Sequence, residues 1–386
     1  MTIATNKGNG NKDGRPLAGH ADNTRRSFLK AGLATGAASA GILAAPAIVN
    51  SHELIRWTMV SSWPKGAPGV GVNAERLAEK ITAMSDGRIQ IQFFAGGELV
   101  PPLSVFDAVI DGTADLAHTT PHYAVGKDQA LHFFTGVPFG LTALEHSAWL
   151  RFGGAQELWD RAYEPFGLKP FYAGSSGPQA GGWFRDEIQS LEDLQGLNFR
   201  VAGLGGEVMR RIGVNPVLLP PNQIVPAMQD GTIDAAEWVG PWNDLALGLF
   251  QVAKHYYMPA FHEMGPALEL IVNRQKYDAL PADLQALVSE ASMAAAMETT
   301  VDFAYHNIVS LPTLIDEHEV QLHTLPDDVM DALAGESVSV LQEVSGSSPI
   351  AGETYASFQA FRARANRYAQ VSDLAALQMR AKALER

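Results

Sequence analysis

A nearly identical heptapeptide occurs twice in the chain, as DGTADLA from Asp111 to Ala117 and as DGTIDAA from Asp230 to Ala236. A Pro-Pro pair precedes both copies at the same distance, at 101–102 and at 220–221. Asp-Gly is typical of a helix end, because glycine readily adopts the left-handed conformation that follows the last turn. The repeat therefore predicts a helix that ends and a strand that begins in each of two similar α/β lobes. The alternative is a pair of unrelated helix-stop turns, since Asp-Gly is common in turns.

The segments around the two copies predict the same order of elements. Around the first copy we expect strands at 55–60, 88–94 and 115–118, with helices at 73–84 and 103–110. Around the second copy we expect strands at 198–201, 217–219 and 234–238, with helices at 206–212 and 224–229. This alternation predicts a mostly parallel sheet in each lobe. Ligands of open α/β sheets bind beyond the carboxyl ends of the strands, so the regions of His118 and Glu237 should meet at one cleft.

The rest of the chain changes character. Residues 286–315 favour a helix longer than average, 320–325 favour a strand, and 355–384 favour terminal helices. We expect lobe I at 54–173, with return segments after about 267, and lobe II at 174–266. We expect 283–386 to hold the long helix and the C-terminal helices, which pack on the lobes or on a dimer partner.

The N-terminal 47 residues are typical of an export signal. Thr24 to Lys30 form a twin-arginine pattern, and a mild apolar run follows from Ala31 to Val49. Ala45-Pro46-Ala47 fits a small-x-small cleavage site. The alternative is an anchor that stays in the membrane, but the run is rich in small residues and weakly apolar. We therefore predict twin-arginine export, cleavage near Ala47 and a periplasmic protein.

Composition excludes several classes of partner and cofactor. The chain has 42 acidic and 28 basic residues, which argues against a nucleic-acid partner. It has no cysteine, which removes disulfides, thiolate metal sites and covalent haem attachment.

Enzyme motifs are absent or weak in the sequence. There is no G-x-S-x-G elbow, and His318 and His323 are spaced five apart rather than four, which excludes the helical zinc pattern. The glycines from Gly203 to Gly206 lie between a strand and a helix as in a phosphate loop, but no acidic partner follows at the distance that dinucleotide binding requires. A close-packed turn whose helix N-terminus faces the cleft is the preferred interpretation.

Three polar residues stand where a ligand site is expected. Arg200 ends a predicted strand, and its guanidinium can hold a carboxylate with two parallel hydrogen bonds. Glu237 ends another strand between aromatic neighbours, where a buried acid needs a cation or a donor. Gln179 stands in the glycine-rich segment 177–184, which permits close approach to a ligand. A surface salt bridge, a structural ion pair and an ordinary surface amide are the respective alternatives.

Several blocks of sequence in order resemble the extracytoplasmic solute receptors of tripartite ATP-independent periplasmic (TRAP) transporters, the DctP-like family. The resemblance runs from about Arg56 to the C-terminal helices, and the branch that it resembles includes receptors for α-keto acids and lactate. It is carried by the segments 62–69, 97–101, 126–128, 137–140, 181–185, 203–208, 234–241 and 265–269.

The resemblance implies a two-lobed periplasmic binding protein fold, in which each lobe has a mixed, mostly parallel sheet flanked by helices, followed by long C-terminal helices. It implies a non-enzymatic receptor that holds a small 2-oxo or 2-hydroxy monocarboxylate, pyruvate- or lactate-like, with a sodium or calcium ion, and delivers it to the TRAP membrane permease. By resemblance, Arg200 clamps the carboxylate, and Tyr123 hydrogen-bonds the ligand from the first lobe. The implied ligand-binding set is completed by Gln179, Glu237 and Trp238, and the implied cation ligands are Gln179, Glu237, the backbone of Trp238, and Glu263.

Some alternatives stay open at this point. His122 and His262 stand where the family pattern leads us to expect aromatic residues, so the identity of the acid is undetermined. A periplasmic metal-dependent lyase or isomerase acting on keto acids is the alternative function, and a sensor that presents its ligand to a membrane kinase is another. The C-terminal helices either join a homodimer or pack on the lobes of their own chain.

Overall fold

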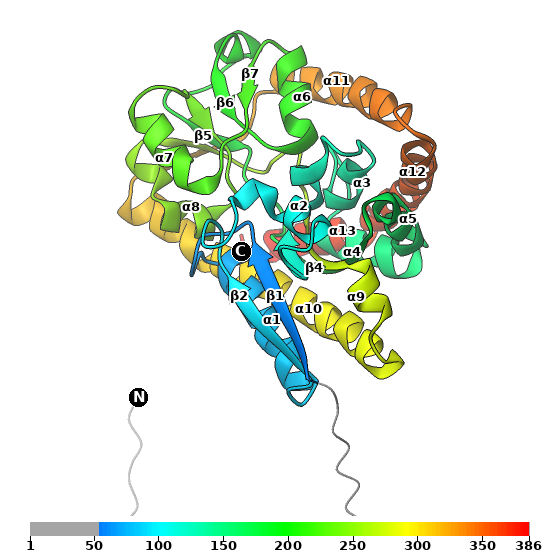
Figure 1. Cartoon of the computed structure of the whole chain (residues 1–386). Helices are drawn as coiled ribbons and strands as arrows, with labels where there is room; N and C mark the ends of the chain where they lie inside the picture. Colours follow the sequence, from blue (N-terminus) through cyan, green and yellow to red (C-terminus); the bar gives the residue numbers. More distant parts are fainter. Residues whose placement is uncertain (1–53, 386) are drawn as a thin grey trace, which may run out of the picture. The chain divides into compact units, whose positions relative to one another are not determined.

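The computed structural model describes residues 54–385 (Figure 1). The predicted export signal at residues 1–47 lies outside the described residues. Among the described helices, none is long and apolar enough to cross a lipid bilayer.

The first sheet has five strands in the order β2-β1-β3-β10-β4. Strands β1 and β2 are parallel, as are β1 and β3, whereas β10 runs antiparallel to both β3 and β4. The bounds are β1 Ile55–Ser61, β2 Ile89–Phe94, β3 Leu116–Thr119, β4 Leu168–Ser175 and β10 Ala267–Asn273. The parallel part is the predicted β-α-β-α-β unit, with α1 (Val70–Met84) and α2 (Val105–Ile110) as its helices.

The second sheet has six strands in the order β11-β9-β5-β8-β6-β7. Strand β6 is parallel to β7 and to β8, and β5 is antiparallel to β8 and β9. The bounds are β5 Gly182–Phe184, β6 Asn198–Arg200, β7 Asn215–Val217, β8 Ala235–Ala236, β9 His255–Tyr257 and β11 Gln321–His323. Its helices α6 (Gly203–Arg211) and α7 (Pro221–Gln229) complete the second β-α-β-α-β unit. The predicted fold class, two mixed α/β sheets flanked by helices, is confirmed.

The two heptapeptides adopt the same local structure. Gly112 and Gly231 have φ of 81° and 80°, in the left-handed region. The carboxylate before each glycine accepts the N–H of the threonine after it at 2.9 Å. Hydrogen bonding from the side chain and the backbone of this threonine lowers the pKa of Asp111 and Asp230. The second aspartate of each copy bonds the backbone of the neighbouring parallel strand, Thr58 in one lobe and Asn198 in the other. The repeat thus ends a helix and joins the next strand to its sheet in both lobes.

The C-terminal half is largely helical, as predicted. Helix α10 (Ala282–Pro312) packs against α1 and β4 of the first lobe and against α8 (Pro241–Leu247) of the second. Helix α11 (Asp327–Ser345) lies beside α6, and α12 (Pro349–Ala369) lies beside α5 (Ala155–Tyr163), as Figure 1 shows. The last helix, α13 (Asp373–Leu384), buries no residue. The remaining helices are α3 Leu131–Thr135, α4 Ala143–Phe152 and α9 Arg274–Asp278.

Several predicted boundaries are wrong in the second lobe. The glycines from Gly203 to Gly206 form the first turn of α6, not a turn before it. Strand β7 ends at Val217, where the predicted strand began, and β8 contains only two residues. Glycine is a weak helix former, so propensity favoured a turn, but close packing against α6 requires residues without side chains there. A Cβ on Gly205 would lie 2.8 Å from the His262 ring.

Candidate ligand site

A small cavity lies beyond the carboxyl ends of β6 and β8, between the two sheets. It offers about 30 Å³ to the centres of water-sized molecules and is lined by residues of both lobes. Every residue predicted for the site lines it: Tyr123, Gln179, Arg200, Glu237, Trp238 and Glu263. The structure therefore brings together side chains that are up to 140 positions apart in the sequence, from Tyr123 to Glu263.

Arg200 is the last residue of β6, and only 1% of its surface is exposed. Its Nη1 donates to the Glu237 carboxylate at 2.8 Å and to the Glu237 carbonyl, and its Nε donates to the Leu219 carbonyl at 3.3 Å. The guanidinium also lies over the Trp238 ring, 5.4 Å from its centre. These contacts hold the group in one orientation and use Nε and Nη1, so Nη2 is the nitrogen left for a ligand. A surface salt bridge, the alternative for Arg200, is excluded by this burial.

Glu237 directly follows β8. Its N–H donates to the Arg200 carbonyl at 2.8 Å and so continues the pairing of β6 with β8. Its carboxyl group is as buried as the guanidinium that it faces. Burial raises the pKa of this carboxyl well above its ordinary value, and the Arg200 charge opposes that shift. The group is therefore both a structural ion pair and a wall of the cavity.

Gln179 and Glu263 reach the cavity from two loops that pair with each other. The Gln179 N–H donates to the Glu263 carbonyl at 3.1 Å, and the Gln179 carbonyl accepts the Ala260 N–H at 2.8 Å. The Gln179 amide nitrogen donates to the Ser176 hydroxyl at 2.9 Å, which turns its Oε1 away from this partner. Within residues 54–385, this buried Oε1 has no hydrogen-bond partner. An unpaired buried oxygen is energetically costly, so this atom is available to a hydrogen-bond donor or a cation from a ligand.

The first lobe closes the cavity with aromatic side chains. Tyr123 lies in a short 3-10 helix (Pro121–Ala124) just after β3, and Trp63 follows the end of β1. The two rings are 5.9 Å apart. Burial raises the pKa of Tyr123 to about 12 despite the opposing Arg200 charge, so its hydroxyl keeps its proton. The site thus has a charged side from the second lobe and a largely apolar side from the first.

The two unexpected histidines contact the two acids. His122 Nδ1 lies 3.3 Å from Glu263 Oε1, and His262 Nε2 lies 4.0 Å from Glu237 Oε2. Burial acts to raise the pKa of Glu263, but His122, His262 and Arg200 together leave it below its ordinary value. Burial lowers the pKa of His262 to about 4, so this ring is neutral at pH 7. His122 lines the cavity, whereas His262 does not.

The donor set fits a hard cation that prefers oxygen. Sodium and calcium bind carboxylate, amide and backbone carbonyl oxygens. The described residues contain no group of three or more His, Asp or Glu side chains that converges on one point, and the predicted set has only two carboxylates. Its other donors are the unpaired Gln179 Oε1 and the Trp238 backbone. Such a set suits sodium or calcium and lacks the imidazole and thiolate ligands that zinc prefers.

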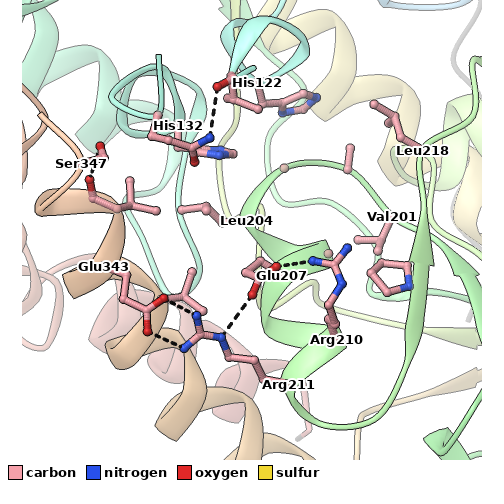
Figure 2. Close-up of a pocket in the computed structure, with 18 of the residues that line it drawn as sticks. His122, His132, Val201, Leu204, Glu207, Arg210, Arg211, Leu218, Glu343 and Ser347 are labelled. Carbon is pink, nitrogen blue, oxygen red and sulfur yellow. Dashed lines mark hydrogen bonds and ion pairs between the residues drawn. The ribbon is translucent and has the colours of Figure 1, made fainter. Parts of the chain in front are cut away.

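A larger hollow of about 470 Å³ adjoins the cavity and shares His122 and Ala202 with it. Figure 2 shows Arg211 held between Glu207 on α6 and Glu343 on α11 at one side of this hollow. Both lobes and α11 contribute to its walls. The hollow is therefore an open vestibule beside His122, and its arginines are already paired with acids.

Sequence reasoning missed part of the wall. Trp63, Val70, Thr120 and Ser176 line the cavity, and none has a spacing signal that links it to Arg200 or Glu237. The available signal was topological: β1 and β3 are parallel neighbours, so the residues after both strands reach the same edge as the repeat.

A charged cavity between two α/β lobes, at the carboxyl edges of both sheets, defines a two-lobed solute-binding protein. Residues 59–347 match the model of bacterial extracellular solute-binding protein family 7, named DctP. The chain belongs to this family, whose members include the solute receptors of TRAP transporters. Membership makes this protein a periplasmic transport receptor.

Individual relatives are similar over most of their length. A monocarboxylate 2-oxoacid-binding periplasmic protein of Nostoc sp. is 39% identical over 320 residues, which cover 83% of this chain and 87% of the relative. A TRAP receptor of Bordetella bronchiseptica, a mixed occupancy dimer with copurified calcium and picolinate, has a TM-score of 0.84 at 35% identity and covers 86% of this chain and 98% of its own. A receptor of Pseudoalteromonas atlantica with bound sodium and pyruvate has a TM-score of 0.82 at 34% identity and covers 84% and 99%.

Proposed function

We propose that the protein binds a small 2-oxo or 2-hydroxy monocarboxylate, pyruvate- or lactate-like, together with one sodium or calcium ion, and delivers it to a TRAP membrane permease. The observation that carries the proposal is the convergence of Arg200, Glu237, Gln179 and Glu263 on one buried cavity. Pyruvate with sodium in a similar receptor, and 2-oxoacid binding by the Nostoc relative, support the choice of ligand.

Each residue has a proposed role. Nη2 of Arg200 holds the ligand carboxylate, while Tyr123 donates to the ligand from the first lobe. Glu237, Gln179 Oε1, the Trp238 carbonyl and Glu263 hold the cation, which also contacts the ligand carboxylate. When bound, the cation supplies positive charge and fixed orientation, and the protein residues exclude water around it.

The size of the cavity supports a very small acid. A compact ligand gains at most about 1.5 kcal/mol per non-hydrogen atom, and micromolar affinity requires about 8 kcal/mol. A monocarboxylate of about six heavy atoms reaches this only if nearly every atom is used. Charge-assisted hydrogen bonds of about 1.5–3 kcal/mol each, with a cation on the carboxylate, supply that density of contact.

Calorimetry with pyruvate in the presence of calcium or sodium tests the proposal. Arg200→Ala should abolish measurable binding. Because breaking a buried ion pair costs about 3–5 kcal/mol, its melting temperature must be recorded beside the affinity, and Arg200→Lys serves as the variant that keeps the charge. Arg161→Ala, which breaks an exposed pair with Glu353, is the matched control and should bind as the wild type. Retained affinity in a folded Arg200→Ala protein contradicts the proposed clamp.

The cation is tested separately. Thorough chelation and removal of sodium should weaken pyruvate binding, and adding back calcium should restore it. Glu263→Gln should weaken this dependence while the fold persists, because the amide keeps the shape of the side chain. Native affinity after complete cation removal would disprove the shared site.

We propose that the protein only binds its ligand and has no catalytic activity; the lyase or isomerase alternative has no supporting observation beyond the acids already used above. Incubating the loaded protein with labelled pyruvate for hours, followed by NMR, distinguishes the two. The same carbon signals at the end indicate a receptor, whereas new products indicate an enzyme.

We propose export by the twin-arginine route with cleavage near Ala47. Replacing Arg25 and Arg26 by lysine should leave the precursor in the cytoplasm, and mass spectrometry of the periplasmic form reads the cleavage site.

We also propose delivery to a permease and a homodimer through the C-terminal helices. Support for the dimer is the exposed apolar surface of α13, where Leu374, Leu377, Met379 and Leu384 are 41–81% exposed. Light scattering of the full mature chain and of a chain ending at Val371 tests it.

A further inference from the structure

The wall of the cavity that faces the charged residues depends on a buried hydrogen bond between two aromatic rings. Trp63 lines the cavity, and its indole Nε1 donates to His118 Nδ1 at 2.7 Å. The two rings meet edge to face, with centres 6.2 Å apart. His118 is 0% exposed and does not line the cavity itself. It can therefore influence a ligand only through Trp63.

The strand pairing explains why these rings meet. His118 lies near the end of β3 and pairs with Ser61 at the end of the parallel strand β1. The Ser62 N–H donates to the His118 carbonyl at 3.2 Å, and the Trp63 N–H donates to the Ser61 hydroxyl at 3.1 Å. A further bond of 2.7 Å joins the hydroxyls of Ser62 and Thr119. The backbone on both sides of the pair is thus fixed, and the indole angle is set by its own hydrogen bond.

The chemistry of the pair is specific. An indole N–H can only donate, so the facing His118 Nδ1 must be bare and the proton of the neutral ring must lie on Nε2. A leucine at this position would fill much of the space but offer no acceptor. An asparagine would place its carbonyl oxygen close to the position of Nδ1. The role of the acceptor can therefore be separated from the role of the volume.

The position of Trp63 relative to the charged groups suggests what it does. On the proposed function Arg200 and the cation hold the carboxylate end, so the rest of the ligand points to the wall from the first lobe, where Trp63 lies with Val70 and Leu268. The cavity is small, about 30 Å³ for the centres of water-sized molecules, so the position of each wall decides how long a ligand it can hold. Movement of the indole is the simplest way to lengthen it, because the opposite side is fixed by the buried ion pair.

We propose that His118 is a positioning residue that locks the Trp63 indole across the end of the cavity, and that this lock limits the chain length of the 2-oxo acid. The inference rests on the proposed function and adds a determinant of specificity to it. Rejection of one additional methylene by a rigid pocket is worth about 10-fold or more in affinity. Releasing the indole should recover on the order of 10-fold for the longer acids, while pyruvate loses little.

The test compares pyruvate with 2-oxobutanoate and 2-oxopentanoate by calorimetry, with calcium present throughout. His118→Leu should shift the affinity ratio towards the longer acids by about 10-fold, whereas His118→Asn should keep the wild-type ratio. His146→Leu is the control, since His146 is another buried histidine in the first lobe, beside Trp149, and it does not line the cavity. It should lower stability and leave the ratio unchanged.

A ligand-free readout accompanies the affinities. The indole N–H of Trp63 should exchange slowly with solvent in the wild type and in His118→Asn, and quickly in His118→Leu. Trp63→Phe assigns this NMR signal and should itself raise the affinity for the longer acids. Adding His118→Leu to Trp63→Phe should then change the affinity ratio no further. This comparison keeps the test decisive if the single leucine variant folds poorly.

The outcomes distinguish a failure of the proposed ligand binding from a failure of the His118–Trp63 lock. No affinity of the wild type for any 2-oxo acid, with a protected Trp63 indole, would refute the proposed function but not the lock. Pyruvate binding with an unprotected indole would refute the lock, as would equal shifts of the ratio in His118→Leu and His118→Asn. An unchanged ratio in a folded His118→Leu protein would show that Trp63 does not limit chain length.

Discussion

Glu269 provides a quantitative test of how the first lobe is built. It lies on β10, an inner strand of the first sheet, and none of its surface is exposed. Its Oε2 accepts the Tyr163 hydroxyl at 2.7 Å, and within residues 54–385 its Oε1 has no partner. Burial raises the pKa of this carboxyl from 4.5 to about 8, with the Tyr163 hydrogen bond opposing the shift. At pH 7 the folded protein therefore carries a neutral Glu269.

The sign of the effect follows from linkage. The folded pKa is above the unfolded one, so the stabilising contribution is complete below about pH 4.5 and is lost as the pH rises to about 8. Over this window the free energy of unfolding should fall by about 1.4 kcal/mol per pH unit, with a total on the order of 3–5 kcal/mol. Glu269→Gln keeps the shape and still accepts from Tyr163, so it should remove this slope.

The assay is urea unfolding followed by circular dichroism at pH 5, 6, 7 and 8. The difference in the free energy of unfolding between Glu269→Gln and wild type cancels the contributions of the other titrating groups. From pH 5 to pH 8 this difference should change in favour of the variant by several kcal/mol, on the order of the total given above. Glu290→Gln, at an exposed pair with Arg151, is the control and should follow the wild type. A difference that is constant across the window would refute a buried neutral Glu269.

Three further outcomes are expected. Gly205→Ala should lower the free energy of unfolding by about 1–3 kcal/mol in chemical denaturation, because its Cβ would lie 2.8 Å from the His262 ring. Tyr123→Phe should weaken pyruvate binding in calorimetry by about 2- to 10-fold with an unchanged melting temperature, since only one hydrogen bond is removed. Asp244→Asn should destabilise the protein by about 2–4 kcal/mol in thermal unfolding, because the buried carboxylate accepts from the Trp183 indole and from a tyrosine hydroxyl at 2.9 Å each, and an amide replaces one of its oxygens by a donor.

Local pattern was sufficient to predict the two β-α-β-α-β units. Helix-stop glycines such as Gly112 and Gly231 carry their own conformational reason, and the strands after them are buried on both faces, so their positions follow from the chain itself. The same logic placed Arg200 and Glu237 at the carboxyl edge of one sheet, where the structure has them 2.8 Å apart.

The remaining part of the site depends on contacts that no periodicity encodes. Gln179 and Glu263 lie in loops that pair with each other through backbone hydrogen bonds, and Trp63 reaches the cavity because β1 lies beside β3. The lobe bounds at 54–173 and 174–266 stay a proposal. The first turn of α6 was mistaken for a loop because glycine propensity was weighed without the ring of His262 that packs against it.

The buried charges also explain why an anion and a cation should bind together. Glu237 and Glu263 both line the cavity of Arg200; burial raises the pKa of Glu237, the Arg200 charge opposes this shift, and the Glu263 charge adds to it. A cation on these oxygens would favour the ionised acid and remove part of the demand on Arg200. The guanidinium then has more capacity for the ligand carboxylate, which in turn adds a negative charge beside the cation. Each ion therefore lowers the desolvation cost of the other, and linkage requires that each raise the affinity of the other by the same factor.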